Sequence, residues 1–181
     1  MFGFNYVAKC MSASEPEDPS QRPPFHLEIL SAPLEKSRVQ VAVTDAVEAL
    51  RQTLCPTKAR QAAYTFSLKF STNEEVQALN HTYRGQNKPT NVLSFEDDEP
   101  HHNTPPYMGD IIIADEVTRI EAAENNIPVE HHISHLVVHG ILHLFGFDHM
   151  EEDEACQMED LEGRILNQLG IANPYKLTGV Q

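Results

Sequence analysis

The sequence predicts an α+β fold: a single domain with a mixed sheet of roughly four strands packed by helices. Three observations support this prediction. Several short segments alternate apolar and polar residues, as half-buried strands do. Longer segments repeat apolar residues every three or four positions, as helices with one buried face do. Apolar residues make up 40% of the 181 residues, which is enough for one sizeable core.

Strands and helices are predicted in mixed order along the chain. Strands are expected at residues 25–29, 64–70, 92–95 and 109–114. Helices are expected at residues 39–54, 73–83, 115–125, 128–145 and 151–169. Thr72 and its polar neighbours should cap the second of these helices, and Asp115 the third. The expected inner residues of the second helix are Val76, Leu79 and Tyr83, and those of the last are Cys156, Leu161, Ile165 and Leu169.

The predicted domain covers residues 25–172. Residues 1–24 are rich in Pro, Ser and acidic side chains, which predicts a disordered N-terminal tail, and residues 173–181 are assigned to a C-terminal tail. Cys10, Cys55 and Cys156 are too few and too scattered for a disulfide framework. No apolar run approaches the roughly 18 residues that a membrane span needs. These features predict a cytoplasmic protein without a membrane partner.

The net charge of −14 is strongly acidic. A protein that coats nucleic acid in general would be expected to have a basic field instead. The charge therefore argues against that class, although it leaves room for a local basic groove or for a large partner that supplies most of the docking surface.

Residues 139–149 carry the strongest chemical pattern, His-Gly-Ile-Leu-His-Leu-Phe-Gly-Phe-Asp-His. His139 and His143 are four residues apart, so on a helix their imidazoles lie one turn apart on one face and can bind one metal ion. Gly146 can take positive φ, end the helix and let the chain present His149 to the same ion. Three protein nitrogens leave a fourth tetrahedral position for water, as in catalytic zinc sites. The pattern predicts a hydrolytic metal site.

The apolar neighbours of these histidines make the helix apolar nearly all round, so it should be buried, and two buried imidazoles need partners. The remaining histidines carry less information. His135 shares the same helix face and is expected to be an outer partner of the ligands or a buried polar residue. Exposure is expected for the other six: His26, His81, His101, His102, His131 and His132.

A zinc peptidase is one alternative for this site. In the peptidase motif a glutamate directly follows the first histidine and acts as the general base, whereas this chain has Gly140 there. The spacing from His139 to His149 fits the metzincin frame, so a peptidase would need its base from elsewhere. A second alternative is a non-enzymatic ribosome-assembly factor whose metal is structural.

The histidine block resembles that of the YbeY family of metal-dependent endoribonucleases and rRNA maturation factors. Two further stretches are similar to that family: residues 79–95, from Leu-Asn-His-Thr-Tyr-Arg to Thr-Asn-Val-Leu-Ser-Phe, and residues 108–113, Met-Gly-Asp-Ile-Ile-Ile. The resemblance covers about residues 25–170. One departure is Asn91, where the family usually has aspartate, so an acid–base task at that position is in doubt.

The resemblance implies one zinc ion per chain, held by His139, His143 and His149. It also implies a single-strand-specific endoribonuclease that matures the 3′ end of small-subunit rRNA and takes part in ribosome quality control. The implied partners are rRNA and the small ribosomal subunit, with ribosomal proteins or assembly factors besides. Arg84 falls where the family has an arginine important for activity.

Arg84 is the best candidate to face the phosphate, because a guanidinium can bind two phosphate oxygens at once. Judged without the resemblance, it could equally be an exposed turn arginine. Lys88 could add a point charge nearby, and Ser94 and Asp110 could line the cleft or serve only the structure. The general base stays unassigned.

Overall fold

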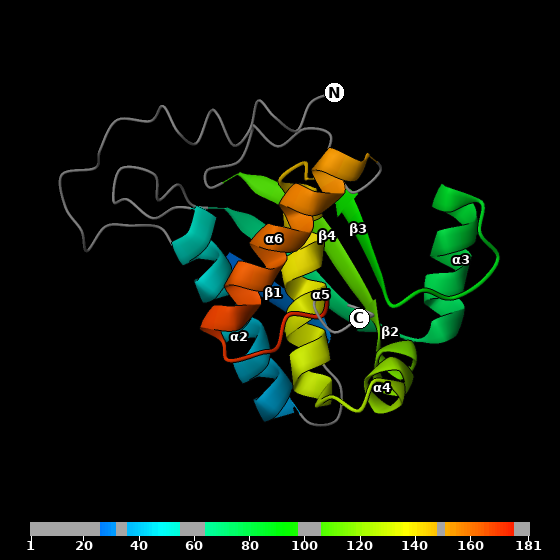
Figure 1. Ribbon diagram of the computed structural model, residues 1–181. Helices are drawn as coiled ribbons and strands as arrows, with labels where there is room; N and C mark the ends of the chain where they lie inside the picture. Colours follow the sequence, from blue (N-terminus) through cyan, green and yellow to red (C-terminus); the bar gives the residue numbers. More distant parts are fainter. Residues whose placement is uncertain (1–25, 32–35, 55–63, 98–105, 148–150, 176–181) are drawn as a thin grey trace.

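A computed structural model describes residues 26–31, 36–54, 64–97, 106–147 and 151–175 (Figure 1). The predicted N-terminal tail, residues 1–24, and residues 176–181 lie outside these ranges. No helix within them is both long enough and apolar enough to cross a bilayer. The domain limits stay a prediction.

Within these ranges the sheet has four strands, which agrees with the roughly four that the sequence predicts. They are β1 (His26–Ser31), β2 (Thr65–Ser71), β3 (Val92–Glu96) and β4 (Tyr107–Ala114), in the spatial order β1-β2-β4-β3. β2 is parallel to both β1 and β4, whereas β3 is antiparallel to β4. The sheet is therefore mixed, which confirms the predicted fold class.

Helices lie on both sides of the sheet (Figure 1). They are α2 (Lys36–Leu54), α3 (Asn73–Arg84), α4 (Asp115–Glu124), α5 (Val129–Leu144) and α6 (Glu152–Gln168). α2, α5 and α6 pack together over one face, and α3 packs over β3 and β4 on the opposite face. Thr72 caps α3 as predicted, since its hydroxyl accepts from the backbone N–H of Glu75.

α5 is the central helix of the fold. It contacts α2, α4 and α6 as well as strands β3 and β4. Leu136, Val137, Ile141 and Leu142 on this helix are at most 3% exposed, and the main core cluster includes all four. The prediction of a buried helix that is apolar nearly all round is confirmed.

Two predicted inner faces are partly wrong. Tyr83 is 67% exposed, because Val76 and Leu79 form the inner side of α3. The Tyr83 ring makes only an edge contact with the Phe95 ring. Cys156 is also exposed. The other three predicted residues of α6 are confirmed, since Ile165 is buried and Leu161 and Leu169 are partly buried against the core. The buried residues of α6 also include four that were not predicted: Met158, Glu162, Gly163 and Leu166.

Two local predictions near the histidine helix need the same kind of correction. His132 is buried rather than exposed, because its Nε2 lies 2.8 Å from the Glu121 carboxylate on α4. Asp115 is the first residue of α4 and not its cap: the N-cap is Ala114, which has no side-chain cap hydrogen bond. An acidic side chain in the first turn still favours the helix through the helix dipole.

Candidate metal centre

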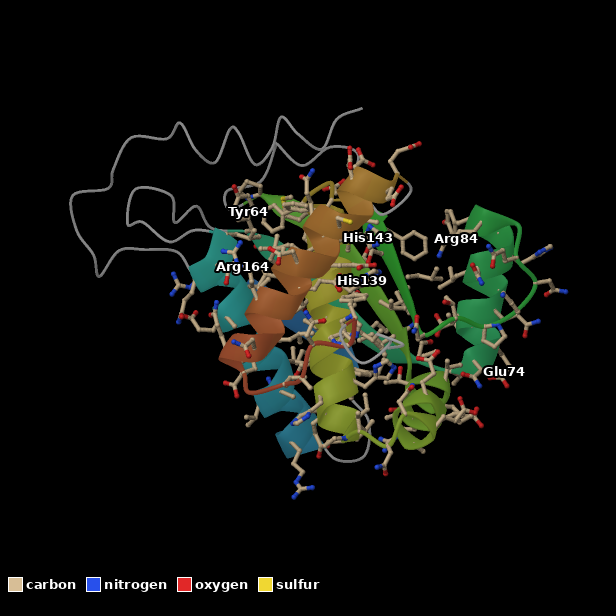
Figure 2. The ribbon with its side chains drawn as sticks, viewed as in Figure 1. Tyr64, Glu74, Arg84, His139, His143 and Arg164 are labelled. Carbon is tan, nitrogen blue, oxygen red and sulfur yellow. The ribbon has the colours of Figure 1, made fainter. Side chains whose placement is uncertain are left out.

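Histidines form a row along one face of α5, where His135, His139 and His143 follow one another at one-turn spacing and their rings are in contact. His139 and His143 are labelled in Figure 2. The Nε2 atoms of His139 and His143 lie 3.1 Å apart, and their rings are nearly perpendicular with centroids 4.5 Å apart. Two nitrogens that each bind zinc at 2.0–2.1 Å in tetrahedral geometry lie roughly 3.3 Å from each other. The pair is therefore placed to bind one ion through both Nε2 atoms.

Gly140 lets this part of α5 lie very close to the sheet. A Cβ atom at this position would be 3.0 Å from the Ile111 Cγ2 and 3.1 Å from the Ser94 Oγ. Residue 140 thus faces β3 and β4, at a contact with no room for a long side chain. This packing explains why a glutamate cannot occupy the position that supplies the general base in zinc peptidases.

The turn after α5 has the conformation that the sequence predicts. Gly146 has a φ of +79°, and its N–H donates to the His143 carbonyl at 2.7 Å. Positive φ at this place ends the helix at low cost only for glycine. His149 and Asp148 lie outside the described residues, so the third predicted ligand stays a prediction.

A buried carboxylate on α6 completes the described site. Glu162 is 0% exposed, and its Oε1 accepts from the His139 Nδ1 at 2.7 Å. Its Oε2 lies 3.1 Å from the His135 Nε2 and accepts from the Tyr175 hydroxyl. Burial raises the pKa of the Glu162 carboxyl, but hydrogen bonds from His135 and His139 outweigh burial and lower the pKa to about 2. The carboxylate is therefore ionised at neutral pH.

His135, His139 and Glu162 also form a group that could hold a metal ion by itself, since their ligand atoms lie within 4.8 Å of one another. The described residues thus offer a choice between two ligand sets. One uses the Nε2 atoms of His139 and His143, and the other uses the carboxylate. The first set offers imidazole donors and the second offers imidazole and carboxylate donors, and both kinds of donor suit zinc and related divalent ions.

Glu162 and Tyr175 are the residues of this site that the sequence prediction missed. Glu162 lies four residues from both Met158 and Leu166, so helical spacing alone could have placed it on the inner face. Tyr175 had no comparable signal, because it follows the last helix in a segment assigned to a tail. Its position depends on how residues 171–175 fold against α6.

Arg84 lies on a different element from the histidines. It is the last residue of α3, it is exposed, and Gly85, with a φ of +69°, ends the helix directly after it. Figure 2 shows Arg84 and His143 toward the same end of the fold, with β3 between their helices. Lys88 is exposed in the turn that follows, which the Asn80 side chain fixes by donating to the Lys88 carbonyl at 2.7 Å.

Ser94 and Asp110 have different surroundings. Ser94 faces the turn of α5 that carries the histidines, as its contact with Gly140 shows. Asp110 alternates with Ile111, so its side chain is on the opposite face of the sheet, where it accepts from the Tyr107 hydroxyl at 2.6 Å. Asp110 therefore belongs to a polar cluster away from the histidines.

Asn91 acts as a structural residue in this chain. Its Oδ1 accepts from the backbone N–H of Val92 at 2.8 Å, and its Nδ2 donates to Glu121 at 3.0 Å. Glu121 in turn contacts His132, so the amide joins β3 to α4 and α5. An aspartate at position 91 would place a second carboxylate against Glu121, and the amide avoids that repulsion.

Together these features define a class: an α+β protein with a candidate metal centre on its central helix. The family model described as "Endoribonuclease YbeY" matches residues 31–170, and the chain belongs to this family. The family implies a metal ion at this site.

Several relatives and one solved structure are similar to the chain. A protein of Allorhizobium ampelinum named "Endoribonuclease YbeY" is 53% identical over 111 residues, which are 60% of this chain and 66% of the relative. A protein of Rhizobium meliloti with the same name is 50% identical over 115 residues, 62% of this chain and 68% of the relative. The solution structure of TM1509 from Thermotoga maritima matches with a TM-score of 0.51 at 21% identity, over 86% of this chain and 99% of that one. The latter similarity supports the fold.

Proposed function

We propose that this chain is a zinc-dependent endoribonuclease that cleaves single-stranded RNA and matures the 3′ end of small-subunit rRNA, with a part in ribosome quality control. The observation that carries the proposal is the facing pair of Nε2 atoms on His139 and His143, 3.1 Å apart on the central helix. Membership of the family, and the name shared by the relatives, support the reaction class. The proposed partners are rRNA, the small ribosomal subunit and its assembly factors, in the cytoplasm.

The proposed ligands are His139, His143 and His149. The first two stand one turn apart on α5, and Gly146, with a φ of +79°, ends that helix before His149. A bound zinc ion supplies an acidified water and polarises a phosphoryl oxygen. Single-stranded RNA is the proposed substrate, because its backbone and bases are open to a compact protein.

Arg84 is proposed to bind the phosphate next to the scissile bond. Its guanidinium is exposed at the end of α3, and among the described residues it forms no ion pair that would hold it elsewhere. Fork-shaped binding of two phosphate oxygens stabilises the negative charge that develops during cleavage. Lys88 adds a positive charge in the following turn.

The close packing at Gly140 argues against a zinc peptidase, because it leaves little space for the glutamate that would act as the general base. The position that would carry the base faces Ile111 and Ser94 across a contact of 3.0–3.1 Å. A glutamate there would have to displace Ile111 or Ser94.

The first test compares H143A with H81A, which removes an exposed histidine on α3. We expect H143A to lose bound zinc and cleavage of single-stranded rRNA together, while H81A keeps both. Zinc content is measured by atomic spectrometry, and cleavage on RNA and on casein in parallel. Full zinc occupancy in H143A would refute the ligand set, and casein cleavage without RNA cleavage would favour a peptidase. A zinc-loaded wild type that cleaves neither would favour the assembly factor.

The second test compares R84E with R164E, a matched charge reversal on the outer side of α6 whose arginine side chain is 64% exposed. We expect R84E to keep the metal but to cleave RNA at least roughly tenfold more slowly, as loss of a charge-stabilising group does. R164E should behave as wild type. Equal cleavage by the two variants would show that Arg84 is bystander surface.

A further inference from the structure

A fully buried carboxylate in the core needs partners that offset the loss of water. Glu162 is 0% exposed and lies on the inner face of α6 beside Ile165 and Leu166. An ionised carboxylate only accepts hydrogen bonds, so every partner must donate to it. Three partners surround it: the His139 Nδ1, the His135 Nε2 and the Tyr175 hydroxyl.

This arrangement determines which nitrogen of His139 carries the proton. Because Glu162 can only accept, the His139 Nδ1 must be protonated, at a contact of 2.7 Å. In the neutral ring the lone pair then lies on Nε2, the atom that faces His143 at 3.1 Å. The Glu162 carboxylate thus leaves the lone pair of His139 on Nε2, the atom through which the metal ion is proposed to bind.

The distances distinguish this role from direct ligation by Glu162. Two atoms bound to one tetrahedral zinc ion lie roughly 3.3 Å apart, whereas a charge-assisted N–H···O⁻ hydrogen bond measures about 2.7–2.9 Å. The contact of 2.7 Å between His139 and Glu162 fits the hydrogen bond. The 3.1 Å between the Nε2 atoms of His139 and His143 is longer than such a charge-assisted bond and approaches the ligand spacing.

The segment after α6 folds back so that Tyr175 reaches this carboxylate. The backbone N–H of Ile171 donates to the Leu166 carbonyl at 3.0 Å, and that of Tyr175 donates to the Asn173 side chain at 2.9 Å. Asn173 lies against Gly163, where an added Cβ would be only 2.2 Å from its Nδ2. The glycine next to Glu162 therefore leaves the space in which this segment packs.

We propose that Glu162 and Tyr175 are positioning residues, which hold the His139 ring in its Nδ1–H tautomer and thereby set the affinity of the site for its metal ion. The inference rests on the proposed function in one respect, that His139 binds the ion through Nε2. Outer carboxylates that fix a ligating imidazole typically contribute 10–100-fold to metal affinity, because they orient the ring and make it more basic. Tyr175 and His135 keep the carboxylate itself in place.

The test measures zinc affinity and the His139 tautomer in E162Q and Y175F. The control is D160N, which removes the same charge from the exposed side of α6, where the Asp160 side chain is 74% exposed. Zinc dissociation constants come from competition with a chromogenic chelator, and the tautomer from ¹⁵N shifts of the imidazole in the metal-free protein. Urea unfolding of the metal-free variants reports folding.

We expect E162Q to bind zinc about 10–100-fold more weakly and to lose the Nδ1–H signal of His139. Y175F removes one of three donors and leaves the His139 contact, so a smaller loss of roughly two- to tenfold is expected. D160N should match wild type. If E162Q fails to fold, the zinc affinity of Y175F decides the question: a loss supports the positioning role, and an unchanged affinity contradicts it.

Two outcomes would overturn the inference in distinguishable ways. Unchanged zinc affinity in both E162Q and Y175F, with H143A still losing the metal, would leave the proposed function standing and reduce Glu162 to a structural role. Complete loss of zinc in E162Q, with zinc retained in H143A, would make Glu162 a direct ligand beside His135 and His139. That second result would refute the proposed ligand set as well.

Discussion

Replacing Gly140 tests whether the helix that carries the histidines is held against the sheet as tightly as the structure shows. In G140A the new Cβ would stand 3.0 Å from one Ile111 carbon and 3.2 Å from another, so Ile111 must yield by a few tenths of an ångström. Overpacking of this kind costs about 1–3 kcal/mol, and alanine in a helix returns about 1 kcal/mol relative to glycine. We expect G140A to lower the free energy of unfolding by about 0–2 kcal/mol.

G140E adds a carboxylate to the same contact and recreates the peptidase motif in sequence. The atoms nearest a Cβ at this position belong to Ile111 and the Ser94 hydroxyl, and none of them carries a charge that would offset the carboxylate. An uncompensated buried charge costs about 3–5 kcal/mol, which is a large share of the roughly 5–15 kcal/mol by which typical domains are stable. We therefore expect G140E to unfold at much lower urea concentration than G140A and to gain no peptidase activity.

The assay is urea unfolding followed by circular dichroism, with casein hydrolysis in parallel. A78E is the control, because it places the same side chain on an exposed position of α3 and should change stability by less than about 0.5 kcal/mol. A G140E protein as stable as wild type would show that α5 does not pack as described. Casein cleavage by G140E would support the alternative that the metal site can act as a zinc peptidase.

Three further predictions concern the sheet, pH and the metal. G109A should lower the free energy of unfolding in urea by at least about 2 kcal/mol, because Gly109 has a φ of +136° and an added Cβ would overlap the Phe95 carbonyl. The control G85A should lower it by less, because Gly85 has a φ of +69° and no atom lies within 4 Å of an added Cβ. Burial and donation to Asp110 raise the pKa of Tyr107 to about 12, so its stabilising contribution is complete below about pH 10 and is lost from there to pH 12. The stability gap between wild type and Y107F should shrink over that interval, and a constant gap would contradict the assignment. Chelation should leave a cooperatively folded protein, and unfolding on chelation would favour a structural metal.

Apolar periodicity was sufficient to predict most elements of this fold. α5 illustrates why. Its apolar residues, such as Leu136, Val137 and Ile141, lie on nearly all sides of the helix, so its burial can be predicted without knowing which elements pack against it. The order of the strands was not predictable in the same way. It depends on pairing between β2 and β4, which are far apart in sequence.

The errors arise where a charged or aromatic side chain departs from its usual environment. Glu162 is not among the predicted inner residues of α6, and a glutamate is rarely fully buried without partners. Its three donors come from α5 and from Tyr175, and none of them is visible in the local pattern of α6. Tyr83 is the converse case, an aromatic at helical spacing that stays exposed because Val76 and Leu79 already fill the contact with the sheet.

α5 serves the core and the candidate site through different faces. Ile141 and Leu142 are fully buried in the main cluster, whereas His135 and His139 keep 20% and 23% of their side chains exposed. Because the buried face packs without the histidines, we expect the fold to form before any ion binds. The carboxylate of Glu162 then supplies, without an ion, the hydrogen bonds that orient two of these rings. A site arranged in advance loses little conformational freedom when the metal enters, and this is what a catalytic centre on a rigid scaffold requires.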